Sequence, residues 1–242
     1  MRSVQRILAV FESFTADRSS LTLQEIADRI GLPKSTSFRI VQSLEKEKYL
    51  VRLENQKYCL SFRFMRLAGL VGSTLDIRAI ARPIMSELAE KTDETVTLHM
   101  VSGRDRVCID CVAAGAPLRT VTPPGQHIRL LVGSPSEVLM AYMGKDELAP
   151  ILSFISRTTK RSKANLLAAY ATIRAQGYAV SHGARVLGIT GVAAPIKDVE
   201  QQVRYCLAVT GPSVRVEPRE REFIKLVAKA AVDISLGYGA TI

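Results

Sequence analysis

The chain has 242 residues, enough for one large domain or two modest ones, and its 47% hydrophobic and 23% charged content is that of a soluble globular protein. It contains no apolar run of about 18 residues and no secretory leader, which excludes a membrane-spanning helix, and we expect a cytoplasmic protein. The net charge is +10, with 12 Lys and Arg against 7 Asp and Glu in residues 1–70, so a polyanion is the candidate partner of the N-terminal part.

Three helices are predicted near the N-terminus. The first covers residues 3–15, where apolar residues recur at helical spacing. The second begins after Thr22, which forms the capping box T-x-x-E with Glu25, and ends before Gly31, a residue suited to the position after a helix. A proline then suits the first turn of a third helix over residues 33–48.

A short hairpin follows the third helix. The tetrapeptides Leu-Val-Arg-Leu (50–53) and Lys-Tyr-Cys-Leu (57–60) flank the turn Glu-Asn-Gln. Three helices followed by a hairpin are the pattern of a winged helix-turn-helix. A further helix over residues 61–71 is predicted to connect this module to the rest of the chain.

The third helix has two contrasting faces when residues are advanced by about 100° each. The residues expected to pack on the first two helices are Phe38, Ile40, Val41 and Leu44. The opposite face has no acidic residue and presents Ser35, Arg39, Gln42 and Lys46. In a helix-turn-helix, such a face enters the major groove, where Arg suits guanine, Gln suits adenine and Ser suits either.

Phosphate contacts are expected beside this face. Lys34 and Thr36 lie at the start of the helix, where free N–H groups favour an anion, and Arg52 and Lys57 lie in the hairpin. The candidate DNA-binding residues are Thr22, Lys34, Ser35, Thr36, Ser37, Arg39, Gln42, Arg52 and Lys57. A merely solvated helix face is the alternative, which the adjoining turn, hairpin and local charge disfavour.

The pattern after residue 76 predicts a mixed domain with a mostly antiparallel sheet. Helices are predicted over residues 77–91, 134–143, 146–155, 163–176 and 219–236. Strands are predicted over residues 95–101, 106–112, 118–122, 178–182, 188–194 and 203–210. The first two strands form a hairpin around the turn Ser-Gly-Arg-Asp.

Cys108 and Cys111 form a C-x-x-C sequence, which suggests half a zinc site or a redox pair. However, residues i and i+3 of a strand point to opposite faces, no second such pair exists, and the chain has only three histidines. Buried strand cysteines are therefore the favoured interpretation, and we expect no metal and no cofactor.

Seven segments resemble, in order, landmarks of the IclR family of bacterial transcriptional regulators. SVQRIL near the N-terminus is similar to the family's first helix, and LTLQEIADRIGLPKSTSFRIVQSL is close to its helix-turn-helix over the full length. The segments that resemble its C-terminal landmarks are KTDETVTLHM, GQHIRLL, GYAVSHG, GITGVAAPI and LAVTGPSVR. The resemblance covers almost the whole chain.

The resemblance implies an α+β protein with a winged helix-turn-helix over residues 1–60, a linker helix over 61–75, and a GAF-like α/β effector-binding and oligomerisation domain over 76–242. It also implies a homodimer, often paired into a homotetramer, on palindromic double-stranded operator DNA. The effectors of such regulators are small organic acids or aromatic compounds.

The family's effector pocket lies over the sheet of the second domain. By the resemblance, one wall is the start of the helix at Gly133 and Ser134, whose N–H groups are expected to hold a carboxylate. The effector-binding residues that the resemblance implies are Met100, Cys108, Leu131, Gly133, Ser134, Ser181, Gly191, Ala208 and Thr210.

This sequence departs from the family's pattern at several polar positions. Ser-Pro-Ser-Glu at 134–137 replaces the usual small residue followed by Gly-Lys, Ala184 replaces an acid, and Ala208 replaces a common Ser. Because a buried carboxylate needs donors, we expect a ligand less polar than glyoxylate or pyruvate. An aromatic or weakly polar acid, or a lactone-like molecule, fits this expectation.

The sequence leaves two other interpretations open. In one, the second domain only oligomerises or binds a partner protein, without a small-molecule effector. In the other, the chain is an enzyme with a winged-helix appendage, but it lacks G-x-S-x-G, P-loop and H-E-x-x-H motifs. We therefore expect no catalytic residues.

Overall fold

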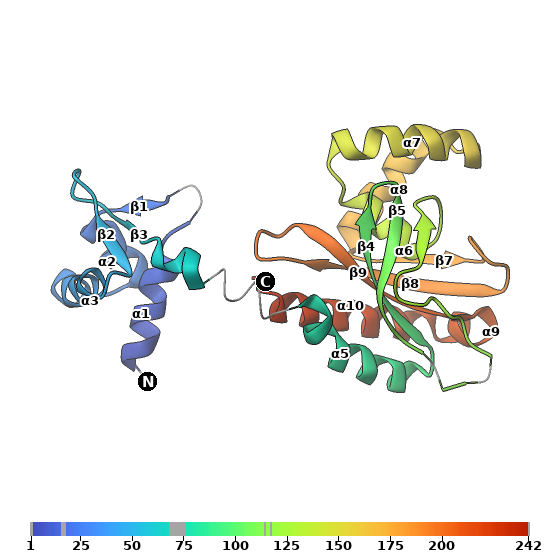
Figure 1. Ribbon diagram of the computed structural model, residues 1–242, viewed down its shortest axis with the longest axis horizontal. Coiled ribbons are helices and arrows are strands. Elements are labelled where there is room, and N and C mark those ends of the chain that lie inside the picture. The colour runs from blue at the N-terminus through green and yellow to red at the C-terminus, as the bar shows by residue number, and fades with distance from the viewer. Residues whose placement is uncertain (1, 16–17, 68–75, 114, 117, 242) are drawn as a thin grey trace. The chain divides into compact units, whose positions relative to one another are not determined.

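The computed structural model describes residues 2–15, 18–67, 76–113, 115–116 and 118–241 (Figure 1). The chain divides into two compact units, Met1–Leu75 and Asp76–Ile242, and each has its own hydrophobic core. Within the described residues, no helix combines the length and the apolar character needed to cross a membrane.

The N-terminal unit has the expected winged-helix elements. Its helices are α1 (Arg2–Glu12), α2 (Leu23–Ile30) and α3 (Lys34–Lys46). Its antiparallel strands, in the spatial order β1-β3-β2, are β1 (Ser20–Leu21), β2 (Leu50–Arg52) and β3 (Tyr58–Leu60). The sequence did not predict β1, because two residues are too few to show a periodic pattern. Residues 63–67 are helical, and the rest of the expected linker helix, 68–75, lies outside the described residues.

The predicted ends of α2 are confirmed. The Glu25 N–H donates to Thr22 Oγ1 at 3.2 Å, and the Thr22 N–H donates to the Glu25 carboxylate at 2.7 Å, which completes the capping box. Gly31 ends the helix with φ +63°, a conformation that a Cβ disfavours. These two local signals set where the turn before α3 begins.

The prediction that Phe38 of α3 packs on the first two helices is wrong. The buried stripe of the helix consists of Ser37, Val41 and Leu44, whereas the Phe38 side chain is 44% exposed. The small Ser37 fits the interior because its hydroxyl donates to the Pro33 carbonyl at 3.2 Å. Phe38 lies one position further round the helix and faces solvent.

The C-terminal unit is built on a six-stranded antiparallel sheet in the order β6-β5-β4-β9-β8-β7. The strands are β4 (Thr95–Ser102), β5 (Asp105–Val112), β6 (His127–Arg129), β7 (Ala179–His182), β8 (Ile189–Lys197) and β9 (Val203–Pro212). The helices are α5 (Ile77–Thr92), α6 (Ser134–Ala141), α7 (Lys145–Thr159), α8 (Lys163–Gln176), α9 (Ser213–Val216) and α10 (Glu220–Gly237), with a 3-10 turn at Glu217–Arg219.

Helices cover both faces of this sheet (Figure 1). On one face, Val96 and Leu98 of β4 form a core with Phe223 of α10 and with residues of α5. On the other face, Ala208 of β9 belongs to a second core with Leu139 of α6 and residues of α7 and α8. Because side chains alternate along a strand, every second residue of β4 and β9 lies beneath the α6 layer.

The strand predicted for residues 118–122 is wrong, and β6 forms the edge of the sheet instead. The carbonyls of this segment accept hydrogen bonds from side chains. Thr95 Oγ1 donates to the Thr120 carbonyl, and Arg215 Nη2 donates to the Leu118 carbonyl, each at 2.8 Å. Such bonds fix the segment beside the sheet without a strand ladder, despite its β-branched residues.

The C-x-x-C sequence lies in strand β5, as predicted. Cys108 is fully buried, and its sulfur donates to the Thr122 carbonyl at 3.3 Å, whereas Cys111 is only half-buried. Burial raises the pKa of the Cys108 thiol to about 12, so the group stays protonated. The described part of the chain contains no group of three or more His, Cys, Asp and Glu that could hold a metal.

An ion pair with one buried partner joins α9, which follows β9, to Glu94, which precedes β4. Glu94 is 1% exposed, and Arg215 donates to its two oxygens from Nε at 2.5 Å and from Nη2 at 2.9 Å. Gly211 leaves the space for this carboxylate, because a Cβ on Gly211 would overlap the carboxylate of Glu94.

We expect the substitution Gly211→Ala to lower the free energy of unfolding by about 1–3 kcal/mol, because the added methyl must displace a buried carboxylate. Urea denaturation of the purified protein measures this change. Gly144→Ala is the control, since a Cβ there meets open space at φ −60°. Equal stability changes in the two variants would contradict the close approach at Gly211.

Candidate DNA-binding face and ligand cavity

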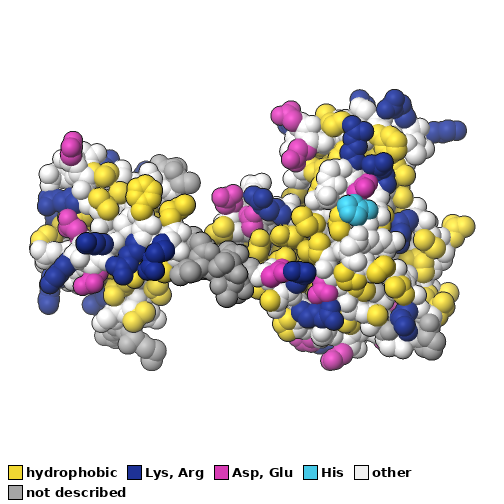
Figure 2. Space-filling view, viewed as in Figure 1, with side chains coloured by type: hydrophobic (Ala, Val, Ile, Leu, Met, Phe, Trp, Pro, Cys, Tyr) yellow, Lys and Arg dark blue, Asp and Glu magenta, His cyan; other side chains and the backbone are white. Residues whose placement is uncertain are grey.

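The exposed face of α3 carries the polar residues that the sequence predicted for it. Lys34, Ser35, Arg39 and Gln42 are all exposed, and no acid lies among the exposed residues between positions 34 and 44. Figure 2 shows Lys and Arg side chains over the visible face of this unit, with fewer Asp and Glu. The exposed ring of Phe38 adds an apolar surface to this polar face.

Two predicted DNA-binding residues have roles within the fold. Ser37 is 0% exposed and lies on the inner side of α3, so the prediction that it binds DNA is wrong. Thr22 is half-buried, and its hydroxyl is engaged with Glu25 in the cap of α2. Thr36 is half-buried near the start of α3.

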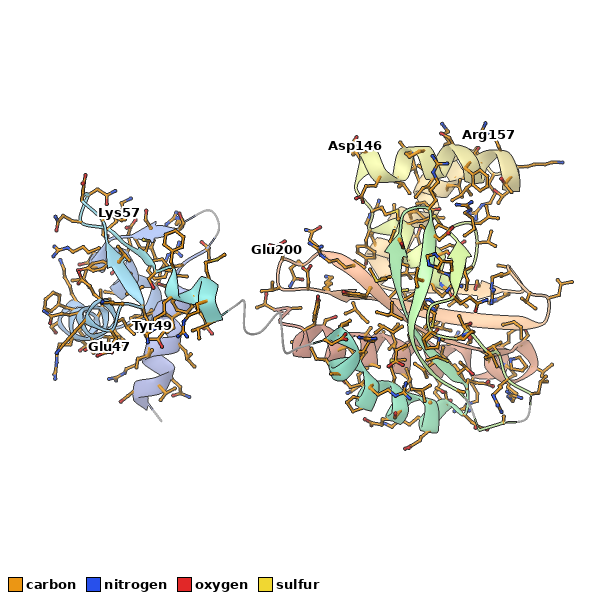
Figure 3. The ribbon with its side chains drawn as sticks, in the orientation of Figure 1. Glu47, Tyr49, Lys57, Asp146, Arg157 and Glu200 are labelled. Atoms are coloured by element: carbon orange, nitrogen blue, oxygen red, sulfur yellow. The ribbon has the colours of Figure 1, made fainter. Side chains whose placement is uncertain are left out.

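The wing presents the two predicted basic side chains near its tip. Arg52 is exposed, contacts the side chain of Gln56, and lies with its guanidinium carbon 5.9 Å from the centre of the Tyr58 ring. Lys57 is half-buried in the hairpin (Figure 3), where its carbonyl accepts a hydrogen bond from the Leu53 N–H at 2.7 Å. Both cations therefore reach the surface of the hairpin, Arg52 more fully than Lys57.

A cavity of about 300 Å³ lies in the C-terminal unit at the start of α6. The predicted effector-binding residues that line it are Gly133, Ser134, Ser181, Gly191 and Thr210. The Ser134 N–H donates to Ser181 Oγ at 2.9 Å, whereas Ser134 Oγ is buried and has no hydrogen-bond partner among the described residues. A Cβ on Gly191 would lie 2.9 Å from Ser134 Oγ, so a glycine at this position leaves the space that the hydroxyl occupies.

Four predicted effector-binding residues do not line this cavity. Met100 lines a different hollow of about 760 Å³, beside Tyr142. Cys108 and Ala208 are fully buried in the sheet, and Leu131 packs against the core under α6. The resemblance implied these residues as part of the pocket, and the first three do lie on strands, as predicted. A position on a strand does not fix which point along it the cavity reaches.

The sequence reasoning missed a buried polar network in the floor of the cavity. His99 Nε2 lies 2.9 Å from Thr97 Oγ1, and His99 Nδ1 lies 3.0 Å from Arg106 Nη1. Arg106 Nε in turn donates to Ser136 Oγ at 3.1 Å. The alternation Thr-Val-Thr-Leu-His in residues 95–99 was the available signal, because it places polar side chains on one face of a central strand.

The network fixes the charges of its two ionisable members. A guanidinium can only donate, so the imidazole nitrogen that it meets must accept, which requires neutral His99. Burial, followed by the field of Arg106, lowers the pKa of His99 well below its usual value. Burial also lowers the pKa of Arg106 to about 10, which leaves it protonated at neutral pH.

His99 should make the protein less stable in acid. Its pKa in the folded state lies below the value of about 6.5 in the unfolded chain, so the unfolded chain binds the extra proton. The stabilisation is complete above about pH 6.5 and is lost as pH falls below it, by up to about 1.4 kcal/mol per pH unit.

Urea denaturation at about pH 7.5 and about pH 5 tests this dependence. We expect His99→Gln to lose less stability than the wild type over this interval. Gln126→Ala, at an exposed neutral residue, is the control and should behave as the wild type does. An unchanged pH dependence in His99→Gln would contradict the neutral, buried imidazole.

Both units match models of one protein family. Residues 70–236 match the model described as bacterial transcriptional regulator IclR C-terminal, and residues 3–54 match the IclR helix-turn-helix domain. The chain is 29% identical to the HTH-type transcriptional regulator KipR of Bacillus subtilis (strain 168), with 99% of this chain and 98% of KipR aligned. It is 28% identical to the HTH-type transcriptional regulator XynR of Escherichia coli (strain K12), with 99% of each chain aligned.

The fold is also found in solved structures. The crystal structure of Pseudomonas aeruginosa HmgR is similar with a TM-score of 0.82 at 22% identity, over 99% of each chain. Together with the family models, which cover most of the sequence, this similarity confirms the resemblance and the fold class. The chain belongs to the IclR family of bacterial transcriptional regulators, which are DNA-binding proteins and not enzymes.

Proposed function

We propose that the protein regulates transcription by reading a palindromic operator with α3 and by binding a small organic effector in the cavity beside α6. The observation that carries the DNA-reading part is the exposed face of α3, on which Ser35, Arg39 and Gln42 lie together without an acid. The N-terminal residues of a recognition helix contact base edges in the major groove. Lys34, Arg52 and Lys57 then supply phosphate contacts, which orient the helix without reading sequence.

Phe38 adds an apolar base contact to the polar base contacts of this proposal. Its ring is exposed between Lys34 and Gln42, positions i−4 and i+4 on the same side of the helix. An aromatic ring on a groove-facing surface can pack on the methyl group of thymine. We therefore infer that the operator half-site contains a thymine beside the base that Arg39 or Gln42 reads.

A homodimer, itself able to pair into a tetramer, is part of the proposal. Apolar side chains are exposed on the N-terminal unit at Val4 (61%), Leu8 (50%), Phe62 (90%) and Met65 (69%). The ring of Phe64 packs edge-on against the ring of Phe11 in α1, with 5.0 Å between the ring centres. The helical residues 63–67 are therefore neighbours of α1. Exposed apolar groups gathered in this way favour association with another chain, and a two-fold dimer matches a palindromic operator.

The alternative is a C-terminal domain that only oligomerises or binds a partner protein. The cavity beside α6 favours an effector, because Ser134 Oγ lies buried there with no partner among the described side chains and backbone groups. Buried hydroxyls are normally hydrogen-bonded, so a ligand that accepts or donates at this point would satisfy it.

Substitutions in α3 test the assignment of base and phosphate contacts. We expect Arg39→Ala to weaken binding to the operator by roughly 1–3 kcal/mol with little effect on other DNA, because a base contact is lost. We expect Lys34→Ala to weaken binding to all sequences alike and to reduce the salt dependence, because a phosphate contact is lost. Fluorescence anisotropy with operator and scrambled DNA at several salt concentrations measures both effects.

Arg221→Ala is the matched control, since Arg221 is an exposed arginine of the other domain. It should leave operator affinity unchanged. The groove-facing assignment of α3 would be wrong if Arg39→Ala and Lys34→Ala bound the operator as tightly as this control.

A thermal-shift screen tests the effector part. We expect the full-length protein to be stabilised by at least one member of a panel of keto acids, aromatic acids and lactones, since a ligand that binds only the folded state raises its stability. The same compound should change the affinity for promoter DNA. A protein stabilised by DNA and by no member of the panel would favour the alternative.

A further inference from the structure

The cavity beside α6 contains a buried positive charge that no acid neutralises. Arg106 is 4% exposed and forms no ion pair with any carboxylate of the described residues. The like charge of Arg185 acts on it, while the nearby thiols of Cys108 and Cys206 stay neutral because burial raises their pKa values to about 12. Buried arginines are rare unless they are paired, so an unpaired one needs a partner from outside the chain.

Arg106 has donors left for such a partner. Its Nε donates to Ser136 Oγ, and one Nη1 hydrogen is directed to the imidazole of His99. Both acceptors are neutral. A guanidinium carries five N–H groups, and those that remain, including both on Nη2, meet no acceptor among the residues that the structure describes.

The rest of the cavity has the same electrostatic character. Arg119 and Arg185 also line it, and no Asp or Glu does so within the described sequence. Its apolar lining comes from Val121, Val186 and Ile189. A ligand with one anionic end and an apolar body would match these two parts of the wall.

The start of α6 offers fewer free backbone donors than the sequence suggested. The Ser134 N–H already donates to Ser181 Oγ, and the next residue, Pro135, has no N–H. One of the two backbone donors expected to hold a carboxylate is therefore engaged, and the proline adds none. What this helix end contributes is the buried, unpartnered Ser134 hydroxyl.

We propose that the effector is a carboxylate whose charge is held by Arg106, with the Ser134 hydroxyl as a further donor and the apolar body against Val121, Val186 and Ile189. This inference rests on the proposed function, because it specifies the ligand of the same cavity. A planar guanidinium pairs with the two oxygens of a carboxylate through parallel N–H groups. The expectation of a lactone-like ligand is thereby replaced, since a neutral lactone would leave the buried charge unpaired.

Matched acids and amides test the charge requirement in the full-length protein. Titration calorimetry and thermal shift at about pH 7.5 compare benzoate with benzamide and pyruvate with pyruvamide, which differ mainly in charge. We expect at least one acid to bind and to raise the melting temperature, and its amide to bind at least about tenfold more weakly, as expected for a lost charge-assisted hydrogen bond.

Variants then assign the effect to Arg106. Arg106→Met should abolish the preference for the acid, and Arg106→Lys should retain it at lower affinity. Arg104→Met is the control, because Arg104 is an exposed arginine in the turn of the same hairpin and does not line this cavity. If Arg106→Met does not fold, the comparison of Arg106→Lys with the wild type decides whether acid affinity depends on this side chain.

The outcomes separate this inference from the proposed function. An amide that binds as tightly as its acid, or an acid preference that persists in Arg106→Met or is unaltered in Arg106→Lys, would overturn the role of Arg106 while leaving effector sensing in place. A protein that responds to no acid and no amide would count against both.

Discussion

Both faces of the six-stranded sheet are covered by helices, and this constraint governs the C-terminal domain. Side chains in the middle of β4 and β9 are buried whichever way they point, so a polar residue there must find its partner inside the protein. Thr97, His99 and Arg106 satisfy one another on the α6 side, with Ser136 from α6 itself. Both ring nitrogens of His99 have hydrogen-bond partners in this network. The positive charge of Arg106, however, has no negative partner among the described residues, and it lies next to a cavity.

In the proposed regulator, the unpaired charge of Arg106 connects the fold to ligand binding. A buried, unpaired cation destabilises the folded domain until an anion reaches it, so a carboxylate would bind the folded state strongly and stabilise it. His99 cannot take up a proton beside Arg106 without adding to this imbalance, and it therefore stays a neutral acceptor. Under the proposal made above, the second domain responds to an anion rather than to pH within the neutral range.

Much of the fold could be predicted because its signals are local. The capping box of Thr22 and Glu25 and the left-handed Gly31 each depend on a few neighbouring residues, and together they placed the helix-turn-helix. The strand predicted at 118–122 failed because its partners, Thr95 and Arg215, are far away in sequence and bond through side chains. A local pattern of β-branched residues carries no information about such bonds.

The candidate sites were predicted unevenly for the same reason. The exposed polar residues of α3 follow from helical spacing, but apolar character alone misassigned Phe38, and the fit of Ser37 to the interior depends on tertiary packing. The cavity residues Ser134 and Gly191 were implied by family resemblance, whereas Arg106 was missed. Its importance depends on what surrounds it in three dimensions, namely neutral partners and no acid among the described residues.

The most direct test of a ligand-switched regulator is the coupling between its two sites. The affinity of the full-length protein for DNA from its own promoter is measured by fluorescence anisotropy without effector and with saturating benzoate or pyruvate. A change of about 5- to 150-fold, of either sign, is expected if the acid and the operator favour different states of the protein. An acid that binds in calorimetry but leaves the operator affinity unchanged would contradict the account.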